Sequence, residues 1–475
     1  MALLIRGGLV VGAREQYAAD VLVEEGRIAA VGRGLDGGGA RTLDASGCYV
    51  LPGGVDPHVH LAMPLDGLDT CDDFTSGTAA AAAGGTTSHV DFCLQQPGQP
   101  FADALAAWHR KLADEPPLTD VGFHLLVTDF DGGGGDAGVA EAVAGGVASV
   151  KLFMAYKGAL MVADDVVFRA MRAAARERAV AMVHPESGDV IEALIAEALA
   201  EGRTSPRNHA LTRPPATEGE ATERAIALAA MAGCRLYVAH VSCVEALAPV
   251  ARARAAGADV WAETCPQYLL LDERVLDADE RSAARFVFTP PPRARSNQEP
   301  LWRALADDVL SIVSTDHAPY TLAQKARGRD DFSRIPNGLP GVEHRLTLLH
   351  HFGVRAGRIS LPRLVELTAA APARLFGLAG RKGAIAPGAD ADLVIFDPER
   401  RQTISAATHR TRADYDPYEG IDVVGAPRTV LVRGREVVVD GAVVGEPGHG
   451  RFLPRDRAPA PAAPPPPAAP PSPAA

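Results

Sequence analysis

GGVDPHVH, residues 53–60, decides the interpretation of the fold, because it ends a run of β character with two histidines two positions apart. Side chains at positions i and i+2 of a strand point to the same face, so His58 and His60 would meet on one side of a sheet. Such a pair can chelate a metal ion, whereas a lone His-x-His is more often without function. The other β-like runs of the chain therefore have to show whether this pair binds a metal ion or has no function.

Seven more β-like runs follow, and Ala-rich segments with helical character alternate with them. The β-like runs are TTSHVDFC (86–93), VGFHLLVT (121–128), ASVKLFMAY (148–156), AVAMVHPE (179–186), RLYVAHVS (235–242), ADVWAETCPQY (258–268) and VLSIVSTDHAP (309–319). The helical segments include DDFTSGTAAAAAGG (72–85), DDVVFRAMRAAARERA (164–179), TEGEATERAIALAAMAG (217–233) and VEALAPVARARAAG (244–257). Eight β/α units in about 320 residues predict an α/β fold with a TIM-type (β/α)8 barrel at residues 55–379.

The two ends of the chain resemble each other and differ from the middle. Short β-branched runs with Gly and Asp between them occur near the start, in LLIRGGLVV (3–11), and near the end, in TVLVRGREVVVDGAVV (429–444). This pattern is typical of hairpins. We therefore expect a smaller β-sandwich domain that residues 1–54 and 380–455 build together. Residues 456–475 are mostly Pro and Ala, which predicts a disordered, partly polyproline tail.

Composition and charge exclude several classes of protein. A hydrophobic fraction of 47% and a charged fraction of 22% are typical of a soluble globular protein. The net charge of −12 offers no basic surface for nucleic acid or an anionic membrane, and no apolar stretch is long enough to span a bilayer. The six cysteines are scattered and the start of the chain is not a convincing signal peptide, which predicts reduced thiols in a cytoplasmic protein.

Polar residues gather where a barrel would place its chemistry, at the carboxyl ends of the strands. Five different β runs end in such residues, which are His58 and His60, Lys151, His184, His240 and Asp316. Imidazole is a good ligand for zinc and similar ions, and four histidines with one carboxylate exceed what a single catalytic ion usually takes. The set therefore predicts two divalent metal ions.

Lys151 has two interpretations. An ammonium has no lone pair for a cation, but beside two cations it would tend to deprotonate, and the neutral amine can add carbon dioxide to give a carbamate that bridges the ions. Alternatively, its stem packs in the barrel and its head reaches water. Asp316 could carry a proton from a metal-bridging hydroxide to a leaving nitrogen, or it could cap a helix. Tyr156 could donate to a developing oxyanion or serve as an aromatic lid.

Several blocks of sequence, in order from about residue 50 to 455, resemble the dihydropyrimidinase and D-hydantoinase family of cyclic amidohydrolases, within the amidohydrolase superfamily. The blocks are PGGVDPHVHLAMP, DDFTSGTAAAAAGGTT, SVKLFMAYKG, ETCPQYLLLD, IPNGLPGVEHR and DYDPYEGIDVVGAPRTVLVRGREVV. The resemblance implies metal-dependent hydrolysis of the cyclic amide bond of 5,6-dihydropyrimidines or 5-substituted hydantoins to N-carbamoyl amino acids. It also implies a homotetramer and a small cyclic ureide as substrate.

The resemblance also implies a role for individual residues. His58, His60 and Asp316 would bind one metal ion, His184 and His240 the second, and Lys151 as N6-carboxylysine would bridge them; zinc is the expected metal. Tyr156 would polarise the scissile carbonyl, and the main chain at Thr289 and Asn337 would hold the ring. Leu65, Phe153 and Leu160 would line the pocket for the ring substituent.

Rival functions and departures from the family pattern remain. Dihydroorotase carries an Arg where this chain has Ala62, while allantoinase is harder to exclude. A single-metal deaminase would lack the bridging Lys, and the non-catalytic dihydropyrimidinase-related proteins lack the ligand set.

The chain departs from the family pattern at a few positions. Thr289 replaces a frequent Ser, HPESGD replaces HAENGD, and TDHAPY replaces TDHCPF. Four more histidines are expected to be structural, which are His89, His124, His350 and His351.

Overall fold

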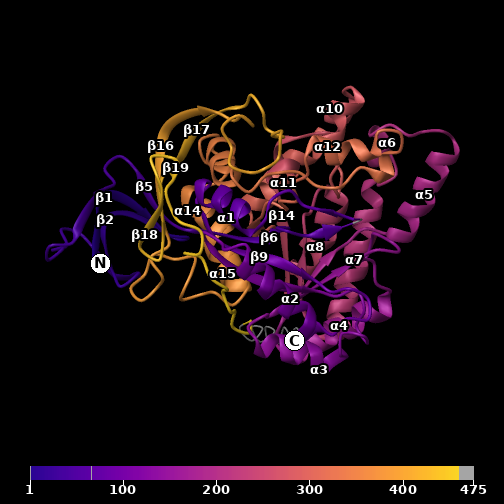
Figure 1. The fold of residues 1–475 in the computed structure, drawn as a ribbon, viewed down its shortest axis with the longest axis horizontal. Coiled ribbons are helices and arrows are strands. Elements are labelled where there is room, and N and C mark those ends of the chain that lie inside the picture. Colours follow the sequence, from indigo (N-terminus) through magenta and orange to yellow (C-terminus); the bar gives the residue numbers. More distant parts are fainter. Residues whose placement is uncertain (1, 66, 459–475) are drawn as a thin grey trace, which may run out of the picture.

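The computed structural model describes residues 2–65 and 67–458, which form a barrel and a β domain beside it (Figure 1). The barrel has eight parallel strands in the order β15-β14-β13-β12-β11-β10-β9-β6. They are β6 (Gly54–Val59), β9 (Thr86–Leu94), β10 (Asp120–Leu126), β11 (Ser149–Phe153), β12 (Val180–His184), β13 (Arg235–Val238), β14 (Val260–Thr264) and β15 (Ile312–Val313). Six lie within predicted runs, and β9 and β10 each extend one residue beyond theirs, so the α/β barrel is confirmed.

Contacts just beyond the short strand β15 close the barrel. Val59 pairs with His317 in a parallel bridge, and the N–H of His60 donates to the carbonyl of His317 at 2.8 Å. Two residues before His317, the hydroxyl of Thr315 donates to the buried Asp56 carboxylate at 2.7 Å. The last strand therefore lies beside the first, which brings the residues after β15 next to the histidines after β6.

Helices cover the outside of the barrel and bury the outer face of its strands. The strands are buried along nearly their whole length, because one face fills the barrel and the other packs against helices. The larger helices are α1 (Phe74–Ala83), α2 (Phe101–Asp114), α3 (Gly135–Ala144), α4 (Asp164–Arg176), α5 (Gly188–Ala200), α7 (Pro215–Ala232), α8 (Val244–Ala255) and α11 (Gln298–Ala306). Shorter ones are α6 (Arg207–Leu211), α9 (Pro266–Leu270), α10 (Glu280–Ala284), α12 (Leu322–Lys325), α13 (Arg345–Leu349), α14 (Leu361–Val365) and α15 (Ala371–Leu375).

The β domain joins both ends of the chain, and Figure 1 shows their strands side by side at the left. Its nine strands belong to one continuous sheet, in which β5 pairs antiparallel with β16. The strands are β1 (Leu3–Val11), β2 (Gln16–Glu24), β3 (Arg27–Gly32), β4 (Arg41–Asp44), β5 (Tyr49–Pro52), β16 (Leu393–Thr403), β17 (Asp422–Val432), β18 (Arg435–Val439) and β19 (Ala442–Val443). Buried residues of both ends share one apolar core, which supports our proposal of a composite domain from residues 1–54 and 380–455.

The last described residues run along the barrel. Val121 of β10 bonds to the carbonyl of Arg451 and to the N–H of Leu453 through its main chain. The contacts extend beyond position 455, since the N–H groups of Asp456 and Ala458 donate to the barrel. The rest of the predicted Pro/Ala tail lies outside the described residues. Among the described helices, none is long and apolar enough to cross a membrane.

Candidate metal and substrate site

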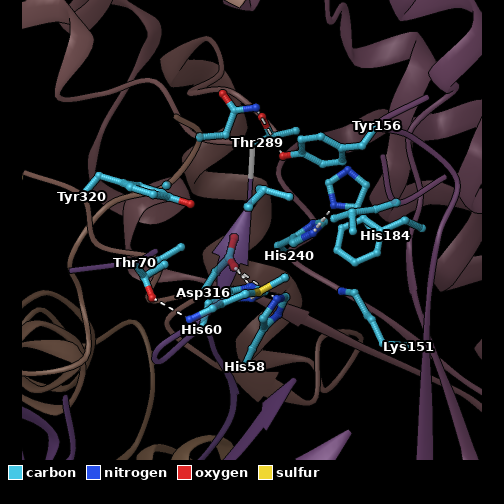
Figure 2. A pocket seen from close by; sticks show the side chains of 17 residues that line it. His58, His60, Thr70, Lys151, Tyr156, His184, His240, Thr289, Asp316 and Tyr320 are labelled. Atoms are coloured by element: carbon cyan, nitrogen blue, oxygen red, sulfur yellow. Dashed lines mark hydrogen bonds and ion pairs between the residues drawn. The ribbon is translucent and has the colours of Figure 1, made fainter. Parts of the chain in front are cut away.

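One pocket at the carboxyl end of the barrel strands contains every residue that the sequence predicted for the site (Figure 2). Its hollow, counted together with the open solvent at its mouth, measures about 520 Å³. The predicted residues in its lining are His58, His60, Leu65, Lys151, Phe153, Tyr156, Leu160, His184, His240, Thr289, Asp316 and Asn337. Met63, Thr70, Ala318, Tyr320 and Gly338 complete the lining.

The first three polar residues converge on one oxygen atom. The Nε2 atoms of His58 and His60 each lie 3.1 Å from Oδ1 of Asp316. Behind them, Nδ1 of His58 donates to the buried carboxylate of Glu263. Burial disfavours the charged form of His58, but Asp316 and Glu263 outweigh it and raise its pKa to about 9. Burial lowers the pKa of His60 to about 4, so this ring is neutral.

The second pair of histidines meets through ring nitrogens. Nδ1 of His184 lies 2.8 Å from Nε2 of His240, and the other nitrogen of His184 lies 2.9 Å from the buried carboxylate of Glu186. Burial lowers the pKa of both His184 and His240, which keeps lone pairs on their rings. Two neutral imidazoles whose nitrogens face each other are a donor set that suits a transition-metal ion.

Lys151 is the most unusual group of the pocket. Its ammonium is fully buried, has no hydrogen-bond partner in the described parts of the chain, and lies 5.1 and 4.9 Å from the ring centres of Phe92 and Phe153. In Figure 2 it points toward the group of histidines. Burial lowers its pKa to about 8, so a neutral amine is accessible near physiological pH. This side chain is not the water-reaching lysine of the alternative interpretation.

The main chain is strained at three residues of the pocket. Tyr156, His240 and Asp316 have positive φ angles of 67°, 37° and 51°. Residues with a Cβ adopt this region at a cost of about 1–3 kcal/mol, and such residues cluster at functional sites. The strain lies at turns that follow β11, β13 and β15, where the chain aims these side chains into the pocket.

Tyr156 and Asn337 lie together in the lining of the pocket. The amide of Asn337 lies 3.4 Å from the Tyr156 hydroxyl. Burial raises the pKa of Tyr156 to about 12, so its hydroxyl keeps its proton and can donate. Leu65, Phe153 and Leu160 supply apolar surface beside these groups.

Comparison with known proteins agrees with this geometry. The sequence model of the "Amidohydrolase family" matches residues 49–437. The chain belongs to the amidohydrolase family. A D-hydantoinase from Geobacillus stearothermophilus is 47% identical over 456 residues, which are 96% of this chain and 97% of the relative. A D-hydantoinase from Streptomyces coelicolor is 47% identical over 95% of this chain and 97% of its own length.

A solved structure of the dihydropyrimidinase from Brevibacillus agri has a TM-score of 0.94 to this amidohydrolase, with 46% identity over 96% of this chain and 99% of that one. These findings confirm the resemblance to the dihydropyrimidinase and hydantoinase family. They also confirm the prediction of a hydrolase that acts on cyclic amides, and favour it over the allantoinase and scaffold alternatives.

Two buried carboxylates of this amidohydrolase were missed by the sequence analysis, namely Glu263 and Glu186. Glu263 accepts from His58 Nδ1, from the Tyr237 hydroxyl and, at 3.1 Å, from the main chain of His240. A signal existed, because Glu263 is the one charged residue between Val260 and Thr264, within an apolar strand. A carboxylate in a fully buried strand needs strong partners.

The histidines expected to be structural lie apart from the pocket lining. His124 contacts the carbonyl of Pro57 at 2.9 Å and the hydroxyl of Ser149 at 2.6 Å, both inside the barrel wall. His89 contacts the Thr119 hydroxyl at 3.1 Å. Both histidines are fully buried, and burial lowers their pKa, so they are neutral.

Proposed function

We propose that this amidohydrolase opens 5-substituted hydantoins and 5,6-dihydropyrimidines to N-carbamoyl amino acids at the described pocket. One observation carries the proposal, which is that four histidines, Asp316 and the unpaired Lys151 lie together beside an apolar pocket. A cyclic ureide needs such a mixture, since its ring offers alternating N–H and C=O groups and its substituent is often apolar.

Two divalent metal ions, zinc by preference, fit the side chains. His58, His60 and Asp316 offer ligand atoms that lie within 4.8 Å of one another, and His184 and His240 offer the second set. A carbamate on Lys151 would supply an anion between the two sets, which fits the absence of any hydrogen-bond partner for this amine within residues 2–65 and 67–458. When bound, the ions make water acidic enough to act as a nucleophile near neutral pH.

The side chains have distinct tasks in the reaction. Asp316 accepts the proton of the attacking water and passes it to the ring nitrogen as the C–N bond breaks. The Tyr156 hydroxyl donates to the carbonyl oxygen, on which negative charge develops. The water oxygen becomes part of a new carboxylate, and the former ring nitrogen stays in the carbamoyl group.

Recognition of the substrate combines main-chain and apolar contacts. We assign the ring to the main chain at Thr289 and Asn337 and the 5-substituent to Leu65, Phe153 and Leu160, all of which line the pocket. Because the relatives described above are named D-hydantoinase, we propose a preference for D-enantiomers. Ala62 offers no cation for a ring carboxylate, so dihydroorotate should be a poor substrate.

We further propose a homotetramer in the cytoplasm. The cytoplasmic location is supported by the cysteines, since all six lie in the described residues and are free. The assembly rests on the resemblance of the segment from Asp414 to Pro454 to the part of the family that reaches across subunits. Light scattering that gives a stable monomer at micromolar concentration would contradict it.

A substrate panel with metal control tests the function. The protein is purified with zinc and bicarbonate, and hydrolysis of hydantoin, D- and L-phenylhydantoin, dihydrouracil, allantoin and dihydroorotate is followed by loss of ring-amide absorbance. We expect hydantoins or dihydropyrimidines to react fastest, chelation to abolish the activity and zinc to restore it. Activity that survives complete metal removal would overturn the mechanism, and allantoin as the best substrate would overturn the assigned substrate class.

A further inference from the structure

A second buried lysine, Lys325 at the end of α12, lies behind the substrate side of the pocket without lining it. Its side chain is 1% exposed. Its ammonium donates to three main-chain carbonyls, at 2.7 Å to Val287, 2.7 Å to Pro336 and 2.6 Å to Gly338. Among the described residues it forms no ion pair with a carboxylate. Burying an ammonium is costly unless every N–H is bonded, and the three carbonyls can accept all three N–H bonds of Lys325. The ring centre of Tyr320 lies 5.9 Å from the same nitrogen.

The three carbonyls belong to the two segments that the proposed function assigns to the ring. Pro336 and Gly338 flank Asn337, and Val287 lies two residues before Thr289. The segments also bond directly, since the N–H of Gly338 donates to the carbonyl of Val287 at 3.0 Å. Lys325 is therefore a single cation that fixes the positions of both segments.

The ammonium holds the main chain on both sides of Asn337. The carbonyls of Pro336 and Gly338 both accept from it, and Asn337 between them lines the pocket. The opposite side of the loop is tight as well, because a Cβ at Gly338 would lie 2.3 Å from the carbonyl oxygen of Ala318.

We propose that Lys325 is a positioning residue for ring recognition, whose ammonium holds the main chain at Asn337 and Thr289 in the orientation that receives the N–H and C=O groups of the cyclic ureide. This inference rests on the proposed function. It concerns neither the metal ions nor the substituent pocket, because Lys325 contacts none of the histidines, Lys151 or Asp316 in the described structure. Without the ammonium, the three carbonyl oxygens would repel one another, and the main chain around Asn337 would change its orientation.

The variant Lys325→Met tests this, because it keeps an unbranched apolar stem and removes all three donors. Kinetics are measured on hydantoin and dihydrouracil, which have no 5-substituent and depend on ring contacts alone. We expect KM to rise about tenfold or more, since hydrogen bonds to a charged group are lost, while the metal content per chain measured by mass spectrometry stays that of the wild type. The ratio of KM values between hydantoin and phenylhydantoin should also stay constant.

Arg455→Met is the matched control. Arg455 is also a buried cation that donates to a main-chain carbonyl, that of Phe123, and to the Ser149 hydroxyl at 2.7 Å, but it contacts β10 and β11 away from the pocket. Its loss should lower the melting temperature and leave KM unchanged. If Lys325→Met does not fold, Lys325→Arg decides, because a planar guanidinium cannot direct three N–H groups as an ammonium does, and a several-fold higher KM is expected.

The outcomes separate this inference from the proposed function. A wild-type protein with full metal content that hydrolyses none of the rings would reject the proposed function itself. A wild type that is active, together with a folded Lys325→Met or Lys325→Arg variant whose KM stays within twofold, would reject the role of Lys325. A variant that loses its metal in parallel with kcat while KM is unchanged would reject it too.

Discussion

Two buried lysines in different regions of the molecule have opposite surroundings. Lys382, where the barrel meets the β domain, has its ammonium 2.8, 3.2 and 2.7 Å from the carboxylates of Asp120, Asp390 and Asp392. Lys151, in the pocket, has no hydrogen-bond partner in the described residues. Burial opposes both charges, but the three carboxylates outweigh it at Lys382 and raise its pKa, whereas the pKa of Lys151 falls to about 8.

This contrast teaches that burial of a lysine does not by itself indicate its role. At Lys382 the protein satisfies the cation with its own acids, which joins Asp120 of β10 to the segment before β16 and thus serves stability. At Lys151 the folded chain keeps an unsatisfied amine at a cost, which selection tolerates where chemistry requires it.

The largest effect is expected from Lys151→Ala. We propose that a carbamate on Lys151 helps to hold the metal ions, so kcat/KM of this variant should fall by about 10³-fold or more, together with the metal content. Short carboxylic acids with bicarbonate should restore part of the activity, because they can replace the carbamate. Native mass spectrometry of the wild type should detect the added carbon dioxide. A Lys151→Ala protein with full activity would contradict a catalytic role for Lys151, and with it the contrast with Lys382.

Lys382→Met should act on stability instead. Three buried carboxylates would lose the cation that they share, although Asp120 keeps its ion pair with Arg433. This loss costs about 3–5 kcal/mol and lowers the midpoint of urea unfolding. The activity per folded molecule and the metal content should stay those of the wild type. A loss of metal with unchanged stability would show that the two lysines do not have separate roles.

A smaller effect is expected from Glu263→Gln, which tests whether the charge behind the first histidine pair serves the metal. Glu263 fixes the ring of His58 so that Nδ1 carries the proton and Nε2 faces Asp316. Its neutral analogue should weaken metal binding by about 10–100-fold. Competition with a chromogenic chelator measures this affinity directly, and Glu115→Gln, at a half-buried carboxylate of the α2 end, is a suitable control. Equal affinities in all three proteins would contradict the expectation.

The smallest effect concerns pH and has opposite signs for the two lysines. In metal-free protein the pKa of Lys151 is about 8 against an ordinary value of 10.5, so its charge costs stability below pH 8 and this cost disappears between pH 8 and 10.5. The raised pKa of Lys382 makes its contribution fully present below about pH 10.5, and it is lost only above that.

Relative to Lys151→Met, the wild type should therefore gain on the order of 2 kcal/mol of unfolding free energy from pH 7.5 to 10. Denaturation curves in chelator and carbon dioxide-free buffer provide the measurement. Relative to Lys382→Met, the wild type should show no such gain over this range. Parallel profiles of the wild type and Lys151→Met would refute the assignment of an unpaired amine.

The pattern of the sequence was sufficient for the barrel and for much of the pocket. All eight strands match predicted apolar runs to within one residue of overhang, because a strand buried on both faces needs apolar residues at most positions. His58, His60, His184 and Asp316 were found from their places at or just after strand ends. Glu186 and Lys325 were not, because they lie outside apolar strands and nothing in their neighbours marks their burial. Glu263 was missed although its apolar strand neighbours were such a mark.

The sequence by itself determined the number and order of the strands and the kinds of donor atoms at their ends, since periodicity and residue chemistry are local properties. Only the tertiary structure decided which groups meet. Glu263 lies 205 positions from His58, and Asp316 lies 256 positions from His60, and closure of the barrel between β15 and β6 brings each pair into contact. Among the described residues, closure also leaves Lys151 without a hydrogen-bond partner and gives Lys382 three carboxylates, because desolvation and charge pairing depend on neighbours that are distant in the chain.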